Sequence, residues 1–260
     1  MRWFLIVLGA SIVGLPARLA LAHDFWIEPS SFAIEPGLEI SVRLKVGHED
    51  DVKEWERKPE RIVRLDAQSP GKAPPRPILG NEGDKPAGRV TLHEPGAHQL
   101  VYRSRHSYIE MPAEKFNAYL DHEGLKAPRR ARGETKEDGL ESYARYCKAL
   151  VRVGDGYEGA SRRVGLALEF MPLQDRFDQS ETLEFVLEFR GKPLVGARVD
   201  LLRLDDLTRS FHTITDNKGV VRFKNPGAGR WMVATTHMIA ASAEIRGDWE
   251  SFWSTLSFLL

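Results

Sequence analysis

Two stretches of this chain alternate apolar and polar residues with a period of two, and this alternation most constrains the fold. Over residues 38–46 every second position is Leu, Ile or Val, and the positions between are Glu, Ser, Arg and Lys. Residues 183–189 repeat the pattern with Leu and Phe. Period two is typical of a strand with one buried face. Turn sequences such as Glu35-Pro36-Gly37 separate the candidate strands. The sequence therefore predicts a mainly β protein with two β-sandwich domains of the immunoglobulin-like kind.

A helical segment is expected to interrupt the strands at about residues 113–153. Pro112 can precede a first helical turn, and Gly124 can end the helix. Between them, Phe116, Tyr119 and Leu120 share one helical side. The charged stretch 126–138 reads as a solvated loop.

A second helix is predicted from Gly139 to Val153. Its apolar residues recur at helical spacing, and Cys147 falls on that apolar face. Because the chain has one cysteine, it cannot form an intramolecular disulfide. We expect Cys147 to be a buried and inert thiol. The expected fold is thus two sandwiches with a short two-helix insertion between them.

The expected division of the chain has four parts. Residues 248–260 are aromatic and apolar, and they are typical of a final strand that packs on the body of the protein. The predicted parts are a signal peptide at 1–22, an N-terminal β-rich domain at 23–163, an immunoglobulin-like sandwich at 164–247 and the final strand at 248–260.

The first residues have the order of a secretory signal peptide. Arg2 precedes an apolar run from Trp3 to Leu15, and Ala20 and Ala22 form a small-x-small cleavage site. Cleavage after Ala22 would place the mature protein in the periplasm or outside the cell. The apolar run is shorter than the ~20 residues of a membrane span, so no membrane insertion is expected after leader removal.

The charge balance argues against a nucleic-acid partner. The chain has 37 basic and 37 acidic residues. The predicted leader contains two of the basic residues, Arg2 and Arg18, and no acidic one, so the mature chain has a net charge of −2. A nucleic-acid or anionic-membrane surface needs a basic excess.

No catalytic motif stands out in the sequence. It contains no Gly-x-Ser-x-Gly elbow, no phosphate-binding glycine loop and no His-Glu-x-x-His helix. The sequence therefore predicts a protein that is not an enzyme.

The histidines are the strongest candidates for ligand chemistry. Cleavage after Ala22 would make His23 the first residue, with an α-amine and an imidazole that can chelate one metal ion. His48 follows a predicted strand within a Gly-His-Glu-Asp-Asp loop, and His237 precedes Met238 at a strand end. Imidazoles suit nickel, cobalt, copper and zinc. We expect a metal site of His23, His48 and His237. The other mature-chain histidines read as surface residues: His93, His98, His106, His122 and His212.

Several sequence words, in this order, resemble a family of exported bacterial proteins of unknown function. They are HDFWIEPS at 23–30, KFNAYL at 115–120, ESYARYCKAL at 141–150, GKPLVG at 191–196, TDNKG at 215–219 and DWESFW at 248–253. Members of that family are often described as the periplasmic component of a cobalt or nickel uptake system of the ABC type. The C-terminal region also resembles carboxypeptidase regulatory-like and transthyretin-like β-sandwiches.

The resemblance implies a non-catalytic periplasmic protein that binds a divalent transition metal, nickel or cobalt in the first place and copper or zinc otherwise. It implies a membrane metal transporter or an outer-membrane receptor as partner. Only His23 stands in the family's opening motif, whereas His48 and His237 follow from local chemistry. Two other readings stay open: an envelope β-sandwich module that binds a protein or a glycan, and a copper oxidase with a terminal histidine ligand.

Overall fold

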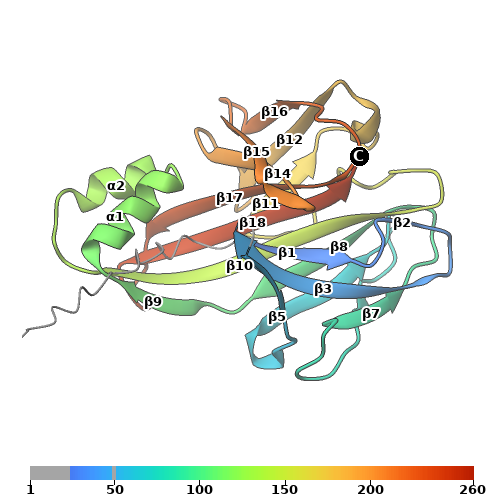
Figure 1. Ribbon diagram of the computed structural model, residues 1–260, viewed down its shortest axis with the longest axis horizontal. Helices are drawn as coiled ribbons and strands as arrows, with labels where there is room; N and C mark the ends of the chain where they lie inside the picture. Colours follow the sequence, from blue (N-terminus) through green and yellow to red (C-terminus); the bar gives the residue numbers. More distant parts are fainter. Residues whose placement is uncertain (1–23, 49–50) are drawn as a thin grey trace, which may run out of the picture.

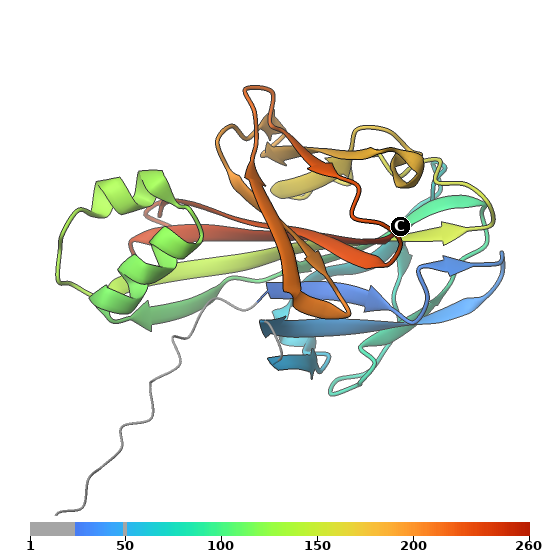
Figure 2. The ribbon, with the colours of Figure 1, turned by 45° about the horizontal axis from the view of Figure 1, so that its top comes forward.

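The protein folds into three layers of β-sheet with a helical hairpin at one end (Figures 1 and 2). The computed structural model describes residues 24–48 and 51–260. Its two α-helices are α1 (Ala113–His122) and α2 (Lys126–Arg132). The mainly β fold predicted from the sequence is confirmed, and two helices interrupt the strands as expected, although the second helix is not at the predicted residues.

A ten-stranded central sheet runs through the molecule in the order β15-β14-β17-β18-β10-β8-β5-β6, with β2 and β9 also paired to β10. Its strands are β2 (Ala33–Ile34), β5 (Ile62–Gln68), β6 (Arg76–Pro77), β8 (Gly96–Ser104), β9 (Ser107–Met111), β10 (Gly139–Val153), β14 (Arg198–Arg203), β15 (Asp206–Ile214), β17 (Arg230–Ala240) and β18 (Trp249–Leu259).

Two four-stranded sheets cover the faces of the central sheet. One contains β1 (Asp24–Pro29), β3 (Glu39–His48), β4 (Asp51–Trp55) and β7 (Gly88–Thr91). The other contains β11 (Leu168–Pro172), β12 (Thr182–Phe189), β13 (Lys192–Pro193) and β16 (Val220–Lys224). Each outer sheet encloses a separate apolar core against the central sheet, and a third, smaller core lies under the helices.

The central sheet crosses the domain boundary that the sequence suggested near residue 163. Strands β5, β8 and β10 come from the first region, and β14, β15 and β17 come from the second. β18 joins the two groups, since it pairs in parallel with β10 and antiparallel with β17. The final strand therefore lies inside the central sheet.

The prediction of a second helix at 139–153 is wrong, because these residues form β10. β10 lies in the middle of the central sheet and is buried on both faces. Ala149 and Val151 belong to one core, whereas Tyr146 and Leu150 belong to the other. A strand buried on both sides reads as a nearly continuous apolar run, and its spacing can imitate a helix. The expected loop at 126–138 is also wrong in part, since α2 occupies its first half.

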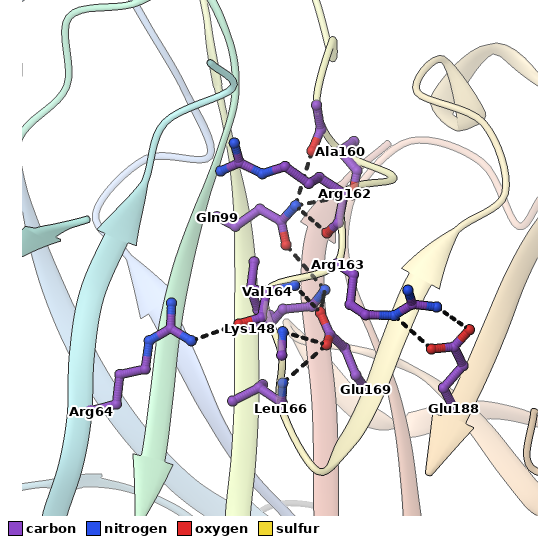
Figure 3. Close-up of polar contacts among 12 residues, drawn as sticks. Arg64, Gln99, Lys148, Ala160, Arg162, Arg163, Val164, Leu166, Glu169 and Glu188 are labelled. Atoms are coloured by element: carbon purple, nitrogen blue, oxygen red, sulfur yellow. Dashed lines mark hydrogen bonds and ion pairs between the residues drawn. The ribbon is translucent and has the colours of Figure 1, made fainter. Parts of the chain in front are cut away.

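A buried ion pair ties β10 to the outer sheet (Figure 3). Lys148 on β10 and Glu169 on β11 are 1% and 2% exposed in their side chains, with 3.0 Å between Nζ and Oε1. The Lys148 ammonium also donates to Gln99 Oε1 at 3.0 Å. The Glu169 carboxylate accepts backbone N–H bonds from Val164, Gly165 and Leu166. Both charges are paired and hydrogen-bonded. The network therefore holds the segment just before β11 in place against β10 of the central sheet.

Cys147 is buried, as predicted, although it lies on a strand and not on a helix. Its thiol lies 3.2 Å from the backbone oxygen of Phe25 on β1. Burial raises the pKa of Cys147 to about 12. A thiol held in its protonated form is a poor nucleophile and a poor metal ligand, so Cys147 serves the core.

Candidate functional site

A polar cavity of about 320 Å³ opens where β1 begins, β3 ends and α1 ends. Asp24 and His48 come from the outer sheet, and His122 and Glu123 come from the helical hairpin. Residues of β14, β15 and β17 form the remaining wall, with Asp200 as their acidic member. Four chain segments that are far apart in sequence thus place two imidazoles and three carboxyl groups around one space.

The two imidazoles lie close together at the cavity. The ring centres of His48 and His122 are 6.3 Å apart, with an angle of 78° between the ring planes. A metal–nitrogen bond of ~2.0 Å puts a ring centre ~3.2 Å from the ion, so two rings on one ion have centres ~5.2 Å apart at a tetrahedral angle and at most ~6.4 Å apart in line. The observed separation is close to the upper limit, so one ion could contact both rings only with the two nitrogens on nearly opposite sides of it.

The orientation of His122 is fixed by hydrogen bonds. Its Nδ1 lies 3.2 Å from Glu123 Oε1. The other oxygen of Glu123 accepts a 2.8 Å hydrogen bond from the Thr236 hydroxyl on β17. The bond to Glu123 raises the pKa of His122. Metal-binding histidines commonly donate one ring N–H to a carboxylate, which leaves the other nitrogen available for the ion. His122 has this arrangement, with Nε2 as the available nitrogen.

Electrostatics in the cavity favour a cation. The pKa of Asp24 is raised to about 8, mainly by burial and also by the neighbouring Glu123 and Asp200 carboxylates, whereas His122 opposes the shift. The Arg198 guanidinium is paired with Asp200 at 2.9 Å, so it balances one of the acidic groups. A bound cation would relieve the repulsion between the remaining carboxyl groups.

The described part of the chain does not complete a metal site by itself. Within residues 24–48 and 51–260, no three His, Cys, Asp or Glu side chains lie close enough together to hold an ion. His23, which the sequence proposed as a ligand, lies outside the described residues. It directly precedes Asp24, and Asp24 lines the cavity. The described residues therefore offer two imidazoles at this cavity.

The structure does not bring His237 together with His48. Thr236 faces the cavity, and the next residue of a strand points to the opposite face. There the His237 ring packs on Phe189, with 4.5 Å between ring centres. Burial and the Arg190 charge lower the pKa of His237 to about 4. His237 is thus a neutral packing residue on the far side of β17.

Sequence reasoning missed His122, Glu123 and Asp200 as members of the cavity. His122 was expected at the surface, and its side chain is indeed 44% exposed, but it also lines the cavity. The sequence feature that could have indicated His122 is the His122-Glu123 pair at the end of the predicted helix, directly before Gly124. A carboxylate beside a histidine can orient its ring. The expectation for His98 was wrong, since it is 3% exposed and bonds to the Glu94 carbonyl.

Fold and cavity define a class: a three-layered β protein with a polar, imidazole-containing cavity beside its first strand. Within that class, the chain belongs to the family described as Domain of unknown function (DUF4198), whose family model matches residues 20–239. The predicted membership in a family of unknown function is thereby confirmed. No curated protein matches the chain. Across the described ranges 24–48 and 51–260, there is no helix of sufficient length and hydrophobicity to pass through a membrane.

Proposed function

We propose that this protein is an exported, non-catalytic binding protein for a divalent transition metal, with nickel or cobalt as the preferred ion. The ligands in this proposal are His23, His48 and His122. The observation that carries it is the pair of neighbouring imidazoles, of which His122 is oriented by Glu123. Imidazole nitrogen prefers ions such as nickel, cobalt, copper and zinc to calcium or magnesium.

His23 supplies the missing donors in the proposal. Removal of residues 1–22 would leave His23 as the first residue, directly before Asp24, which lines the cavity. Together with His48 and His122, these groups would present four nitrogen donors. Because the amine exists only after cleavage, the complete site would form only in the exported protein. The expected recipient of the ion is a membrane metal transporter.

The test is a calorimetric titration of the processed protein with nickel, cobalt, copper and zinc, after mass spectrometry has confirmed that His23 is the first residue. His48→Ala and His122→Ala should each weaken binding by about tenfold or more, since each removes one ligand. One extra residue ahead of His23 should have the same effect. His93→Ala, at an exposed position, is the matched control.

His237→Ala separates this arrangement from the one that the sequence suggested, because it should leave metal affinity unchanged. Equal affinity of the wild type, His48→Ala and His122→Ala would refute the proposed site. Absence of stoichiometric binding to all four ions would refute the proposed function.

A module that binds a protein or a glycan in the cell envelope is the alternative. One observation favours it: β15 lies at the edge of the central sheet and exposes Phe211 and Ile214 at 46% and 52%. An edge strand with apolar side chains is suited to pairing with another chain. Crosslinking from position 211 in cells, followed by identification of one specific partner, would support this reading over metal binding.

A further inference from the structure

Arg145 on β10 lies within a frame of three aromatic rings. Its guanidinium carbon is 4.6 Å from the ring centre of Phe25, 5.3 Å from that of Tyr143 and 5.7 Å from that of Trp55. Phe25 is buried, whereas Arg145, Tyr143 and Trp55 are partly exposed. The faces of the rings attract the positive charge of the guanidinium.

The charge of Arg145 has no acidic partner within residues 24–48 and 51–260. Its guanidinium makes no ion pair and no hydrogen bond there. The backbone N–H of Arg145 donates a hydrogen bond to the Ser104 hydroxyl. A guanidinium presents five N–H donors in one plane, and contacts with aromatic rings do not satisfy them as oxygen acceptors would. The N–H groups of Arg145 therefore have no oxygen acceptor among the described residues.

A second guanidinium lies near the same frame. Arg61 donates to the Ser107 hydroxyl at 2.9 Å, and Ser107 on β9 pairs with Tyr143 on β10. Arg61 has no carboxylate partner among the described residues. Both cations also lower the pKa of the buried Tyr102 hydroxyl, which burial raises.

We propose that Arg145, framed by Phe25, Trp55 and Tyr143 and assisted by Arg61, binds the carboxylate of a small organic anion. One arginine fork matches the two oxygens of a carboxylate. The aromatic walls favour a ligand with an apolar body over a bare inorganic ion. Phosphate sites usually add backbone N–H groups at a helix N-terminus or a glycine loop, and neither is part of this frame.

This site is separate from the metal cavity. Asp24 and Phe25 are consecutive on β1, so their side chains point to opposite faces of the strand. Asp24 lines the cavity, whereas Phe25 forms part of the arginine frame. Anion binding at Arg145 does not require a metal, and its test can succeed or fail independently of the proposed function.

The test uses benzoate as the probe and follows binding by calorimetry and by tryptophan fluorescence in metal-free protein. Saturable binding to the wild type is expected. Arg145→Met keeps the apolar stem and removes the fork, so it should weaken binding by about tenfold or more. Arg61→Met, at an exposed position, should weaken it less. Arg103→Met is the matched control, because Arg103 stacks on Tyr146 at 5.9 Å without joining the frame.

Inorganic phosphate serves as the competing probe and should not displace benzoate. Phosphate binding in place of benzoate would overturn the assignment to an organic carboxylate. Absence of saturable benzoate binding, or equal binding by the wild type, Arg145→Met and Arg61→Met, would overturn the site. Far-ultraviolet circular dichroism of each variant verifies its fold, and the Arg61 variant keeps the test decisive should Arg145→Met fail to fold.

Discussion

At the scale of single residues, Lys148 shows how a charge is kept inside this protein. Its ammonium is held by Glu169 and Gln99, and burial lowers its pKa against the opposing effect of Glu169. Removal of one member of a buried pair leaves the other charge without compensation. Replacement of Lys148 alone by an apolar residue of similar size should therefore lower the stability of the fold, although the volume of the side chain is kept.

We predict that Lys148→Met lowers the free energy of unfolding by about 3 to 5 kcal/mol, because Glu169 keeps its buried charge. Urea denaturation followed by fluorescence measures the change. Lys72→Met, at an exposed position, is the control and should change stability by less than ~0.5 kcal/mol. A loss below ~1 kcal/mol for Lys148→Met would show that the pair contributes little.

His237 predicts an acid-sensitive contribution to stability. Its folded-state pKa of about 4 lies below the usual value of 6.5. The neutral form is thus favoured in the folded protein, and stability is fully present above pH ~6.5 and falls as the pH drops toward ~4. Relative to His237→Leu, the wild type should lose roughly 2 to 3 kcal/mol between pH 7 and pH 4. Parallel stability curves for the two proteins would contradict this expectation.

The residue scale also shows what the sequence could reveal about the site. His48 was predicted because its strand and its acidic loop are visible in the local sequence. His122 was not, because its role depends on the position of the hairpin over β17, which no local pattern encodes. His237 was proposed from its neighbours Thr236 and Met238, but alternation along the strand turns its ring away from the cavity.

At the scale of elements, the α1–α2 hairpin controls the position of His122. Phe116, Tyr119 and Leu120 pack it on the sheet, and Gly139 at the start of β10 lies directly under Phe116. A Cβ atom on residue 139 would overlap the Phe116 ring. The glycine thus permits the close approach of helix and strand.

We predict that Gly139→Ala displaces α1 and lowers stability by about 1 to 3 kcal/mol, as overpacking does. It should also weaken any metal binding that depends on His122. Thermal unfolding and the metal titration measure the two effects. Gly71→Ala is a suitable control, since its added Cβ would meet only the end of the flexible Glu94 side chain. An unchanged unfolding temperature of Gly139→Ala would show that the hairpin accommodates the added Cβ atom without loss of stability.

Strands with one buried face could be recognised from the sequence, whereas a strand with two buried faces could not. Strand β3 alternates clearly and was recognised from its sequence. β10 was mistaken for a helix because its neighbours cover both of its faces. The residues that cover one face include Phe25 and Ile27 of β1, which is distant in sequence, so local periodicity could not reveal the cause.

At the scale of the whole molecule, the shared central sheet joins the two apolar cores. β18 contributes Leu256 and Phe258 to one core and lies beside residues of the other, including Met232 on β17. Because both cores depend on the same strands, neither can lose its packing alone. The sequence suggested two sandwiches, and their fusion through one sheet depends on pairings between distant segments.

We predict a single cooperative unfolding transition for the processed protein, with equal calorimetric and van't Hoff enthalpies. Leu44→Ala in one core and Leu256→Ala in the other should each shift the whole transition, since each removes a buried leucine. Scanning calorimetry measures both variants. Two separate transitions, of which each variant moves only one, would show that the cores unfold independently.

The parallel pairing of β10 with β18 also constrains the order of events during synthesis. Residues 141–149 find their partners at 249–257, roughly a hundred residues later in the chain. Until the ribosome has made that distant segment, the middle of the sheet has an open edge, and the layers on either side lack a shared support. The central sheet consequently cannot be completed until translation is nearly finished.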